Sequence, residues 1–316
     1  MSAKPLAIVN PTSGGGRSRK TLNELRGVLD RALGGVDVAF TERPRHATEL
    51  ARAAARDGRS TVVVVGGDGS IHEAVWGLME AREEGARSTR LGVVGQGTGG
   101  DFRKSLGIEH RLDRYVRAIA GGVTKHVDVA KFTYTSNDDR PATGYFVNIL
   151  SAGMGGLVDR YVHDASGFLG GRAAYFIASA RGLAESELGE LRVTMKLGDK
   201  TETVELTSRQ INVCNGQYFG SGMHIAPMAA LDDGFLEVVD LGASSKLGFL
   251  TFSRKIYDGS HIGHPAVRHF RAERVDIELK NERVRDKYLL DVDGEPLGKL
   301  PISVEVIKGA IEVFVP

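Results

Sequence analysis

Cysteine is scarce in this sequence, because Cys214 is the only one among 316 residues. A single cysteine excludes an intramolecular disulfide bond and a zinc site built from several thiolates. Proteins of a reducing compartment have this composition, so we expect a cytoplasmic location. The nine histidines also lack a metal-ligand pattern, since His261 and His264 have no third ligand at a recognisable spacing.

The sequence also lacks a long block of charge of one sign and a long apolar run. Its formal net charge is +1 and its pI is about 7.9, so we expect no nucleic-acid partner, because such proteins carry a clear basic excess. The most apolar segment, Gly167 to Leu183, contains Arg172 and Arg181 and is shorter than the roughly 20 apolar residues of a membrane-spanning helix. We therefore expect no transmembrane segment, although the protein could still touch a membrane surface and be peripheral to it.

Glycine, in contrast, is abundant, and three of the 41 glycines follow an apolar run at Thr61 to Ser70, TVVVVGGDGS. Four consecutive valines are typical of a central parallel strand that is covered on both faces. The glycines permit positive φ and let backbone N–H groups approach a ligand closely. Asp68 and Ser70 are the side chains with chemistry in this loop. We interpret the segment as a buried strand that leads into a functional site.

Strands and helices alternate over the first 125 residues. The patterns predict strands at residues 6–9, 36–40, 61–65 and 91–94, and helices at 22–33, 47–55, 70–79 and 112–119. Ser70 is the predicted N-cap of its helix, with Glu73 in the capping-box position. Alternation of this kind favours an open parallel sheet with helices on both faces. Loops that begin at Asn10, Thr41, Gly66 and Gly95 should then meet at the carboxyl edge of the sheet, where such folds bind ligands.

From Lys125 onward, short runs alternate apolar and polar residues. They predict antiparallel strands at residues 126–132, 145–150, 191–196, 202–207, 210–214, 236–239, 275–279 and 302–307. One apolar helical insert, Phe168 to Leu183, interrupts them. We predict an α/β domain at residues 1–124 and a β-sandwich domain at residues 125–316. The pattern leaves open whether the last residues return to the first domain.

Two further segments carry chemistry-bearing residues but are weak signals alone. Ser13 to Gly16 could cradle a phosphate through backbone N–H groups at a helix N-terminus. Asp291 to Glu295 places three carboxylates in five residues after an apolar run. On its own, this second segment is better interpreted as a solvated hairpin turn.

Together these segments resemble the diacylglycerol-kinase-type lipid kinases, which include bacterial diacylglycerol kinases, YegS-like lipid kinases and sphingosine kinases. The resemblance covers nearly the whole chain and depends on the order and spacing of several motifs, because GGDG alone also marks NAD kinases and phosphofructokinases. The matching motifs are Asn10-Pro11-x-Ser13-Gly14, Thr41 with His46-Ala47, Gly66-Gly67-Asp68-Gly69-Ser70 with Glu73, Gly97-Thr98 with Asp101-Phe102, Gly170-x-Arg172-Ala173, Asn215-Gly216, Gly220-x-Gly222, Ala226-Pro227, Asp233-Gly234 and Asp293-Gly294-Glu295.

This resemblance implies an ATP-dependent kinase whose nucleotide lies in a cleft between an α/β domain, similar to that of NAD kinase and diacylglycerol kinase, and a β-sandwich. Glu295 is implied as the base that activates the acceptor hydroxyl, and Asp68 as a residue that holds Mg²⁺ and phosphates or shares the base role. In some members a further Mg²⁺ site would fall on Asp233 with the carbonyls of Ala230 and Phe235. The implied nucleotide-binding residues are Asn10, Ser13, Gly14, Thr41, Gly66, Gly67, Asp68, Gly69, Ser70, Ile71, His72, Glu73, Gly97, Thr98 and Asp101.

The predicted function is transfer of the γ-phosphoryl group of ATP to a hydroxyl of a lipid, such as diacylglycerol, at a membrane surface. Two alternatives stay open: an NAD kinase-like enzyme with a soluble substrate, and a non-catalytic nucleotide- or lipid-binding protein. Gly95 and Gly100 motivate the last one, because they stand where the family usually has proline and asparagine. The sequence leaves the lipid and the oligomeric state open, a homodimer included.

Overall fold

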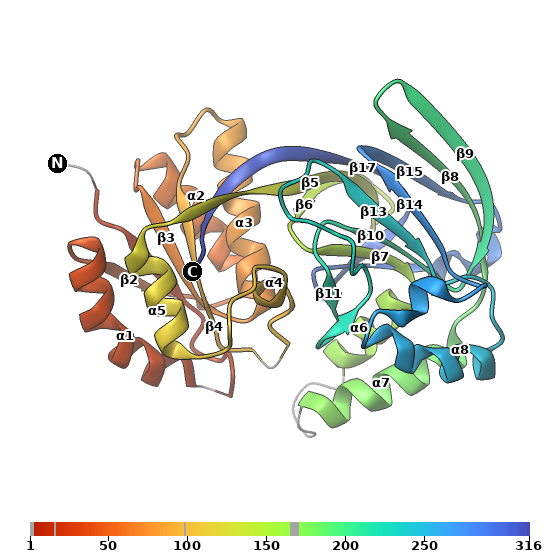
Figure 1. Cartoon of the computed structure of the whole chain (residues 1–316), viewed down its shortest axis with the longest axis horizontal. Coiled ribbons are helices and arrows are strands. Elements are labelled where there is room, and N and C mark those ends of the chain that lie inside the picture. Colours follow the sequence, from red (N-terminus) through yellow and green to blue (C-terminus); the bar gives the residue numbers. More distant parts are fainter. Residues whose placement is uncertain (1–2, 16, 98, 165–170) are drawn as a thin grey trace.

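One continuous sheet organises the chain (Figure 1). The computed structural model describes residues 3–15, 17–97, 99–164 and 171–316. In this part of the chain the sheet has 15 strands, with a main path β14-β13-β10-β7-β16-β17-β4-β3-β1-β2. The predicted α/β half followed by a β-rich half is confirmed. The two halves nevertheless share a sheet instead of having one each.

The strands belong to this sheet or to a small separate hairpin. They alternate with helices mainly in the first third of the chain. The strands are β1 (Leu6–Val9), β2 (Asp37–Phe40), β3 (Thr61–Gly66), β4 (Arg90–Gly95), β5 (Thr124–Ser136), β6 (Pro141–Phe146), β7 (Ile149–Gly153), β8 (Gly189–Leu197), β9 (Lys200–Ser208), β10 (Gln210–Cys214), β11 (Tyr218–Phe219), β12 (Met223–His224), β13 (Leu236–Asp240), β14 (Arg268–Ala272), β15 (Arg274–Leu279), β16 (Leu289–Val292) and β17 (Glu295–Phe314). The helices are α1 (Arg17–Leu33), α2 (His46–Arg56), α3 (Asp68–Glu83), α4 (Asp101–Ser105), α5 (Leu112–Gly121), α6 (Met154–Asp164), α7 (Gly171–Glu185) and α8 (Lys246–Ser253), with short 3₁₀ turns η1 (Arg254–Ile256), η2 (Ser260–Gly263) and η3 (Glu282–Lys287).

The N-terminal half is a parallel sheet in the order β4-β3-β1-β2. Every residue of β3 is buried, as the valine run predicts, because helices cover both faces. The core on one face includes Leu25 and Leu29 of α1 with Tyr115 of α5. The other face packs against α2 and α3. The carboxyl ends of the strands consequently lie along one edge, where their loops can meet.

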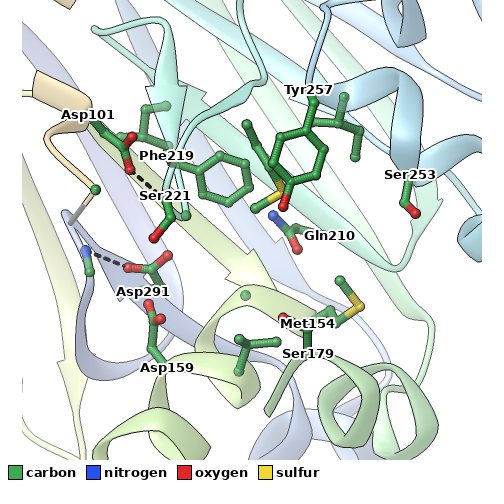
Figure 2. A pocket seen from close by; sticks show the side chains of 18 of the residues that line it. Asp101, Met154, Asp159, Ser179, Gln210, Phe219, Ser221, Ser253, Tyr257 and Asp291 are labelled. Atoms are coloured by element: carbon green, nitrogen blue, oxygen red, sulfur yellow. Dashed lines mark hydrogen bonds between the residues drawn. The ribbon is translucent and has the colours of Figure 1, made fainter. Parts of the chain in front are cut away.

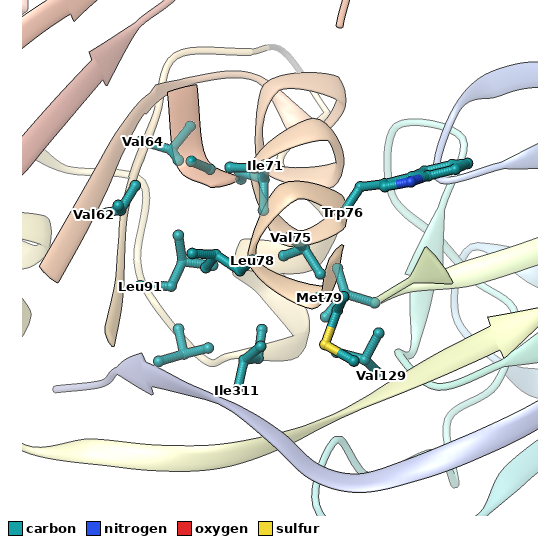
Figure 3. Packing of buried hydrophobic residues seen from close by; sticks show 14 of the residues in the cluster. Val62, Val64, Ile71, Val75, Trp76, Leu78, Met79, Leu91, Val129 and Ile311 are labelled. Atoms are coloured by element: carbon teal, nitrogen blue, oxygen red, sulfur yellow. The ribbon is translucent and has the colours of Figure 1, made fainter. Parts of the chain in front are cut away.

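Helix α3 connects this sheet to the second half of the chain (Figure 3). Ile71, Val75 and Leu78 point at the sheet, and Met79 lies close to Val129 of β5 in the same core. Trp76 turns away from the parallel strands β3 and β4 and packs edge-on against Tyr145 of β6, with ring centroids 6.1 Å apart. Both Trp76 and Met79 are buried, so they belong to the core.

Strand β17 belongs to both halves. It pairs with β16 near its start, with β15 and β5 along its length, and with β4 near its end, where Val313 is parallel to Leu91. The last residues therefore do return to the N-terminal sheet, the point that the sequence left open. In Figure 1, β17 and its neighbour β5 run side by side from one half to the other.

The C-terminal half packs two groups of antiparallel strands around one apolar core. The strand predicted at residues 145–150 is wrong, because Val147 and Asn148 separate β6 from β7. Their backbone N–H groups donate to the carboxylate of Asp293 and so do not continue a ladder. Of the predicted helical insert, residues 171–183 lie in α7, whereas 168–170 lie outside the described residues; α6 is a second helix that the pattern did not predict.

A search of the helices for a membrane-spanning segment, over the residues that the structure describes, finds none that is long and apolar enough.

Gly77 is the residue at which α2 and α3 come closest. A Cβ atom at this position would lie 2.1 Å from the carbonyl oxygen of Thr48, a backbone atom that cannot move away alone. We predict that Gly77→Ala lowers the free energy of unfolding by about 3 kcal/mol, because overpacking against backbone is relieved only by separating the helices. Urea unfolding measures this change. Gly121→Ala, where a Cβ would meet nothing within 4 Å, is the control; equal effects of both substitutions would contradict the prediction.

Candidate active site

Three glycine-containing loops converge at the carboxyl edge of the parallel sheet. A Cβ built on Gly14 would lie 2.4 Å from the carbonyl oxygen of Gln96, so the loops after β1 and β4 touch. A Cβ on Gly67 would lie 3.6 Å from the Cα of Gly97, so the loop after β3 lies against the loop after β4. Glycine permits these backbone approaches, which leave N–H groups accessible to an anion.

The remaining predicted nucleotide-binding residues of the first loops lie close by. Asn10 donates from Nδ2 to the hydroxyl oxygen of Ser70 at 3.2 Å, and the Ser13 hydroxyl faces Gly67. Thr41 is attached to the same edge, because its backbone N–H donates to the carbonyl of Val9. Thr98, which the sequence also assigned to nucleotide binding, lies outside the described residues.

Asp68 stands at the start of α3 and faces the N-terminus of α4. Its carboxylate accepts backbone N–H bonds from Asp101 at 3.2 Å and from Phe102 at 3.3 Å. Burial, and next the negative charge of Asp101, raise the pKa of Asp68 above its ordinary value, although these N–H bonds oppose the rise. A raised pKa makes this carboxylate a better proton acceptor than an exposed one.

Glu295 begins β17 and reaches the same loop from the C-terminal half. A Cβ placed on Gly69 would lie 2.9 Å from Oε1 of Glu295, so only glycine lets the carboxylate come this close. The structure thus brings Glu295 against Gly69, the residue that follows Asp68, although the two are distant in the sequence.

Three predicted nucleotide contacts in α3 have side chains that are used elsewhere. Helix α3 begins at Asp68 with Gly67 as N-cap, so the predicted N-cap role of Ser70 is wrong. Glu73 forms no capping box; its two carboxylate oxygens accept the backbone N–H groups of Arg45 and Ala47 at the start of α2. The Ile71 side chain is apolar and buried in the core, so a hydrogen bond from this residue to a nucleotide would involve its backbone.

Asp293 joins the two halves of the protein. Its carboxylate, with the side chain 3% exposed, accepts backbone N–H bonds from Val147, Asn148 and Ile149 and also contacts Nδ1 of His72 at 3.0 Å. Asp293 and Gly294 both have positive φ, as the two central residues of a tight hairpin require. The hairpin interpretation of this segment is therefore right, but the Asp293 side chain turns inward while Gly294 at the tip stays exposed.

A cavity of about 1330 Å³ begins at Asp68 and Gly69 and continues into the C-terminal half (Figure 2). Its near end is polar, with Asp101 bonded to the backbone N–H of Ser221 at 2.9 Å. Its far end is mostly apolar, formed by α6, α7, α8 and neighbouring loops. The large apolar side chains at that end are Met154, Val158, Leu183, Phe219, Met223, Leu241, Phe249, Leu250, Ile256 and Tyr257. The cavity thus joins the glycine loop after β3 to a space suited to hydrocarbon chains.

Two carboxyl groups, Asp159 and Asp291, face one another in the middle of this cavity (Figure 2). Asp291 also accepts hydrogen bonds from the Ser151 hydroxyl and the Gly294 backbone N–H. Burial raises the pKa of Asp159 to about 6, and burial together with the adjacent Asp159 charge raises the pKa of Asp291 well above its ordinary value. The two groups therefore share a proton near neutral pH.

The predicted further Mg²⁺ site lies among charges of both signs. Asp233 accepts the backbone N–H of Phe235 at 3.0 Å and pairs with Arg271 at 3.3 Å, and Lys308 donates to its backbone carbonyl. Burial, and also the nearby charges of Glu237 and Asp128, raise the pKa of Asp233, whereas Arg271 lowers it. A metal ion at this carboxylate would compete with the guanidinium group of Arg271. The His, Cys, Asp and Glu side chains of the described part do not gather in a metal-binding group of three or more.

The two glycines that depart from the resembled family have structural explanations. A Cβ on Gly95 would lie 2.7 Å from the Tyr115 hydroxyl, which leaves no room for a proline ring. Gly100 has φ 59° and precedes α4 as its N-cap, a conformation that glycine and asparagine both tolerate. Gly100 therefore preserves the loop's backbone.

Sequence reasoning missed Asp159 and the role of Asp293. The available signal for Asp159 was an acidic residue between Val158 and Tyr161, in the apolar part of a helix, where a carboxylate is costly unless it is used. The partner of Asp293 had no signal, since His72 lies 221 positions away.

Comparison with known proteins relates both halves of the chain to kinases. Residues 4–132 match the diacylglycerol kinase catalytic domain, and residues 148–315 match the YegS C-terminal NAD kinase beta sandwich-like domain. A diacylglycerol kinase of Staphylococcus haemolyticus is 28% identical over 313 residues, which cover 98% of this chain and 87% of that protein. A diacylglycerol kinase of Staphylococcus carnosus is 26% identical over 323 residues, which cover 100% and 96%.

Solved structures share the fold. A diacylglycerol kinase from Bacillus anthracis superposes with a TM-score of 0.71 at 22% identity, over 99% of this chain and 97% of that chain. Yeast NADH kinase in complex with NADH superposes with a TM-score of 0.53 at 11% identity, over 100% and 84%. The arrangement of a parallel sheet and a β-rich half is thus common to kinases of lipids and of NADH.

Asp293→Asn tests the junction between the halves. The side-chain amide of asparagine has one acceptor oxygen, whereas the Asp293 carboxylate has two. Two of the four hydrogen bonds to this side chain therefore lose their acceptor, and the amide NH₂ group then faces an N–H donor. We predict a decrease of about 3 kcal/mol in the free energy of unfolding, measured in urea, because hydrogen bonds to a buried charge are lost. Asp232→Asn, on an exposed carboxylate paired with Lys125, is the control and should change little.

The shared proton of Asp159 and Asp291 makes stability depend on pH. The folded-state pKa of Asp159, about 6, lies above the ordinary value of 3.8. The contribution of this group to the free energy of unfolding is therefore fully present below pH 3.8 and is lost as the pH rises through 6. The free energy of unfolding of the wild type should fall between about pH 4 and pH 7. We predict that this fall is smaller in Asp159→Asn, by on the order of 2 kcal/mol. Unfolding curves across this range measure it. The exposed Asp138→Asn variant should retain the wild-type slope; an unchanged slope for Asp159→Asn would refute the shared proton.

Proposed function

We propose that this chain, which belongs to the diacylglycerol kinase family, transfers the γ-phosphoryl group of ATP to a hydroxyl group of a lipid such as diacylglycerol. That it is a kinase follows from the match of its N-terminal half to the catalytic domain and from relatives that align almost end to end. The use of ATP, the lipid acceptor and a peripheral position at a cytoplasmic membrane surface are parts of the proposal.

The observation that carries the lipid acceptor is the cavity. It starts at Asp68 and Gly69, where the phosphates would lie, and extends between the apolar side chains of α6, α7 and α8. A volume of about 1330 Å³ is larger than the phosphate groups of a nucleotide occupy, and it offers room for acyl chains. A nicotinamide dinucleotide is polar along its length and would leave most of this lining without suitable partners.

The geometry suits phosphoryl transfer, which depends on positioning and charge neutralisation. Backbone N–H groups of the converging glycine loops would hold the phosphates. The lipid would enter through the apolar end and present its hydroxyl to Glu295. As the hydroxyl oxygen bonds to the γ-phosphorus and the bond to ADP breaks, the Glu295 carboxylate would accept the hydroxyl proton.

Asp68 is the carboxylate that could hold Mg²⁺ together with the phosphates, because Mg²⁺ prefers oxygen ligands and commonly binds one or two carboxylates plus substrate phosphates. When bound, the ion would neutralise charge on the phosphates. Asp68 is held in place by the N-terminus of α4. This arrangement keeps one carboxylate fixed while Glu295 approaches from the other half.

A transfer assay tests the proposal. Purified protein with Mg²⁺ and γ-labelled ATP is offered a panel of lipids, among them diacylglycerol and a sphingoid base, and separately NAD. We expect label in one lipid and none in NAD. Labelled NAD would instead support a soluble-substrate kinase, and ATP binding without any product would support a non-catalytic protein.

Glu295→Gln keeps the shape of the side chain and removes the proton acceptor. We predict that kcat falls by about 10²–10⁴-fold while the Kd for ATP changes little, because the base acts on the acceptor hydroxyl. Steady-state assays and ATP-binding calorimetry measure the two quantities. Glu305→Gln is a matched control, since Glu305 lies on the same strand, is exposed and lies 3.9 Å from Arg274. Wild-type kcat in Glu295→Gln would exclude Glu295 as the base.

A further inference from the structure

Exposed large apolar side chains concentrate on one side of the C-terminal half. Among the described residues, seven such side chains are exposed, and four of them belong to α7, α8 and the turn that follows α8. These are Ile177 (54%), Leu247 (73%), Leu250 (58%) and Tyr257 (56%). Single exposed apolar residues are ordinary, but a group of four on neighbouring elements marks an interaction surface.

The spacing of three of them places them on one face. Leu247, Leu250, Arg254 and Tyr257 follow one another at intervals of three, four and three residues along α8 and η1. At helical spacing these side chains form one stripe. Phe249, which is 4% exposed, belongs to the buried face. Helix α8 is thus apolar toward solvent as well as toward the core, which packing within this chain does not require.

This stripe lies where the cavity opens. Leu250, Arg254 and Tyr257 are exposed and also line the cavity, so the cavity reaches the solvent between them. Helix α7 borders the same opening, because Ala180 is exposed and lines the cavity too. The start of α8 is bonded to the end of α7 through Lys246 and the carbonyl of Ala184, and Figure 1 shows both helices on the same side of the molecule.

The segment from α8 to Tyr257, which borders the opening, is positively charged. Between residues 246 and 257 the chain has Lys246, Arg254 and Lys255, all exposed, and no acidic residue. Asp258, which follows, is hydrogen-bonded to Ser260. Since the net charge of the whole chain is only +1, the attraction of this face for an anionic surface is local. Apolar side chains flanked by lysine and arginine are typical of helices that lie in a lipid–water interface.

We propose that the face formed by Ile177, Leu247, Leu250, Arg254 and Tyr257, with Lys246 and Lys255 at its border, docks on a bilayer that contains anionic lipid. The two leucines and Tyr257 enter the headgroup region, and the mouth of the cavity then opens directly onto the acyl chains. The docking itself stands on exposure and charge. Only the identity of the molecule that enters the cavity rests on the proposed lipid kinase function.

Vesicle sedimentation of the full chain without ATP tests the docking. Vesicles of phosphatidylcholine alone are compared with vesicles that also contain phosphatidylglycerol. We expect Leu247→Ser to weaken partitioning onto both kinds by about tenfold, because the exposed leucine loses its burial in lipid. Lys255→Glu should weaken partitioning about tenfold on the anionic vesicles only. Leu247 and Lys255 do not line the cavity, so both variants should phosphorylate a short-chain, water-soluble diacylglycerol as the wild type does.

The matched control is Val123→Ser with Leu197→Ser, two exposed apolar residues on other elements, which should bind vesicles like the wild type. Equal partitioning of Leu247→Ser and wild type would overturn the docking face. The alternative occupant of the face is a second copy of this chain, which sedimentation velocity tests. If the wild type is a dimer, and Leu247→Ser is a monomer that binds vesicles as the wild type does, the face is a dimer interface and the proposal is overturned. Loss of phosphoryl transfer in all proteins with normal vesicle binding would remove the kinase function and leave the docking intact.

Discussion

The arrangement of the two halves depends on the buried carboxylate of Asp293. It accepts three backbone N–H groups of the β6–β7 connection and contacts His72 of α3, so one side chain holds the C-terminal strands against the N-terminal helix. The same tight hairpin orients the next carboxylates in the chain. Asp291 turns into the cavity, and Glu295 reaches the glycine loop after β3. A rearrangement of this hairpin would therefore disturb the interface, the cavity and the candidate base together.

Two long strands cross this junction. β5 and β17 pair along most of their length and pass from the parallel sheet into the β-rich half. The end of β17 is parallel to β4, whose loop carries Gly97, while its start carries Glu295. The glycine loops and the apolar cavity thus both adjoin one continuous sheet. This is the structural reason why a site can extend from Asp68 to the exposed stripe of α8.

Much of the fold was predictable because local patterns carry it. The valine run before Gly66 indicated a covered central strand, and its burial follows from helices on both faces. The capping prediction for Ser70 failed for a tertiary reason: Glu73 is recruited by the N-terminus of α2, and Gly67 begins the helix. The break between β6 and β7 was also not predictable, because the Asp293 carboxylate that takes their N–H groups lies about 145 residues further along the chain.

The sequence by itself determined the classes of residue at the site: glycine loops at strand ends, Asp68, Glu295 and an apolar helical region. The glycine loops, Asp68 and the apolar helical region follow from composition and periodicity, which are local properties of the chain, whereas Glu295 follows from the resemblance of Asp293-Gly294-Glu295 to a motif of the family. Only the tertiary structure decided which groups meet. It brought Glu295 to Gly69, paired Asp159 with Asp291, paired Asp233 with Arg271 and left Leu247 exposed beside the cavity mouth. Such contacts join residues that are distant along the chain, and their energies depend on burial, which periodicity does not specify.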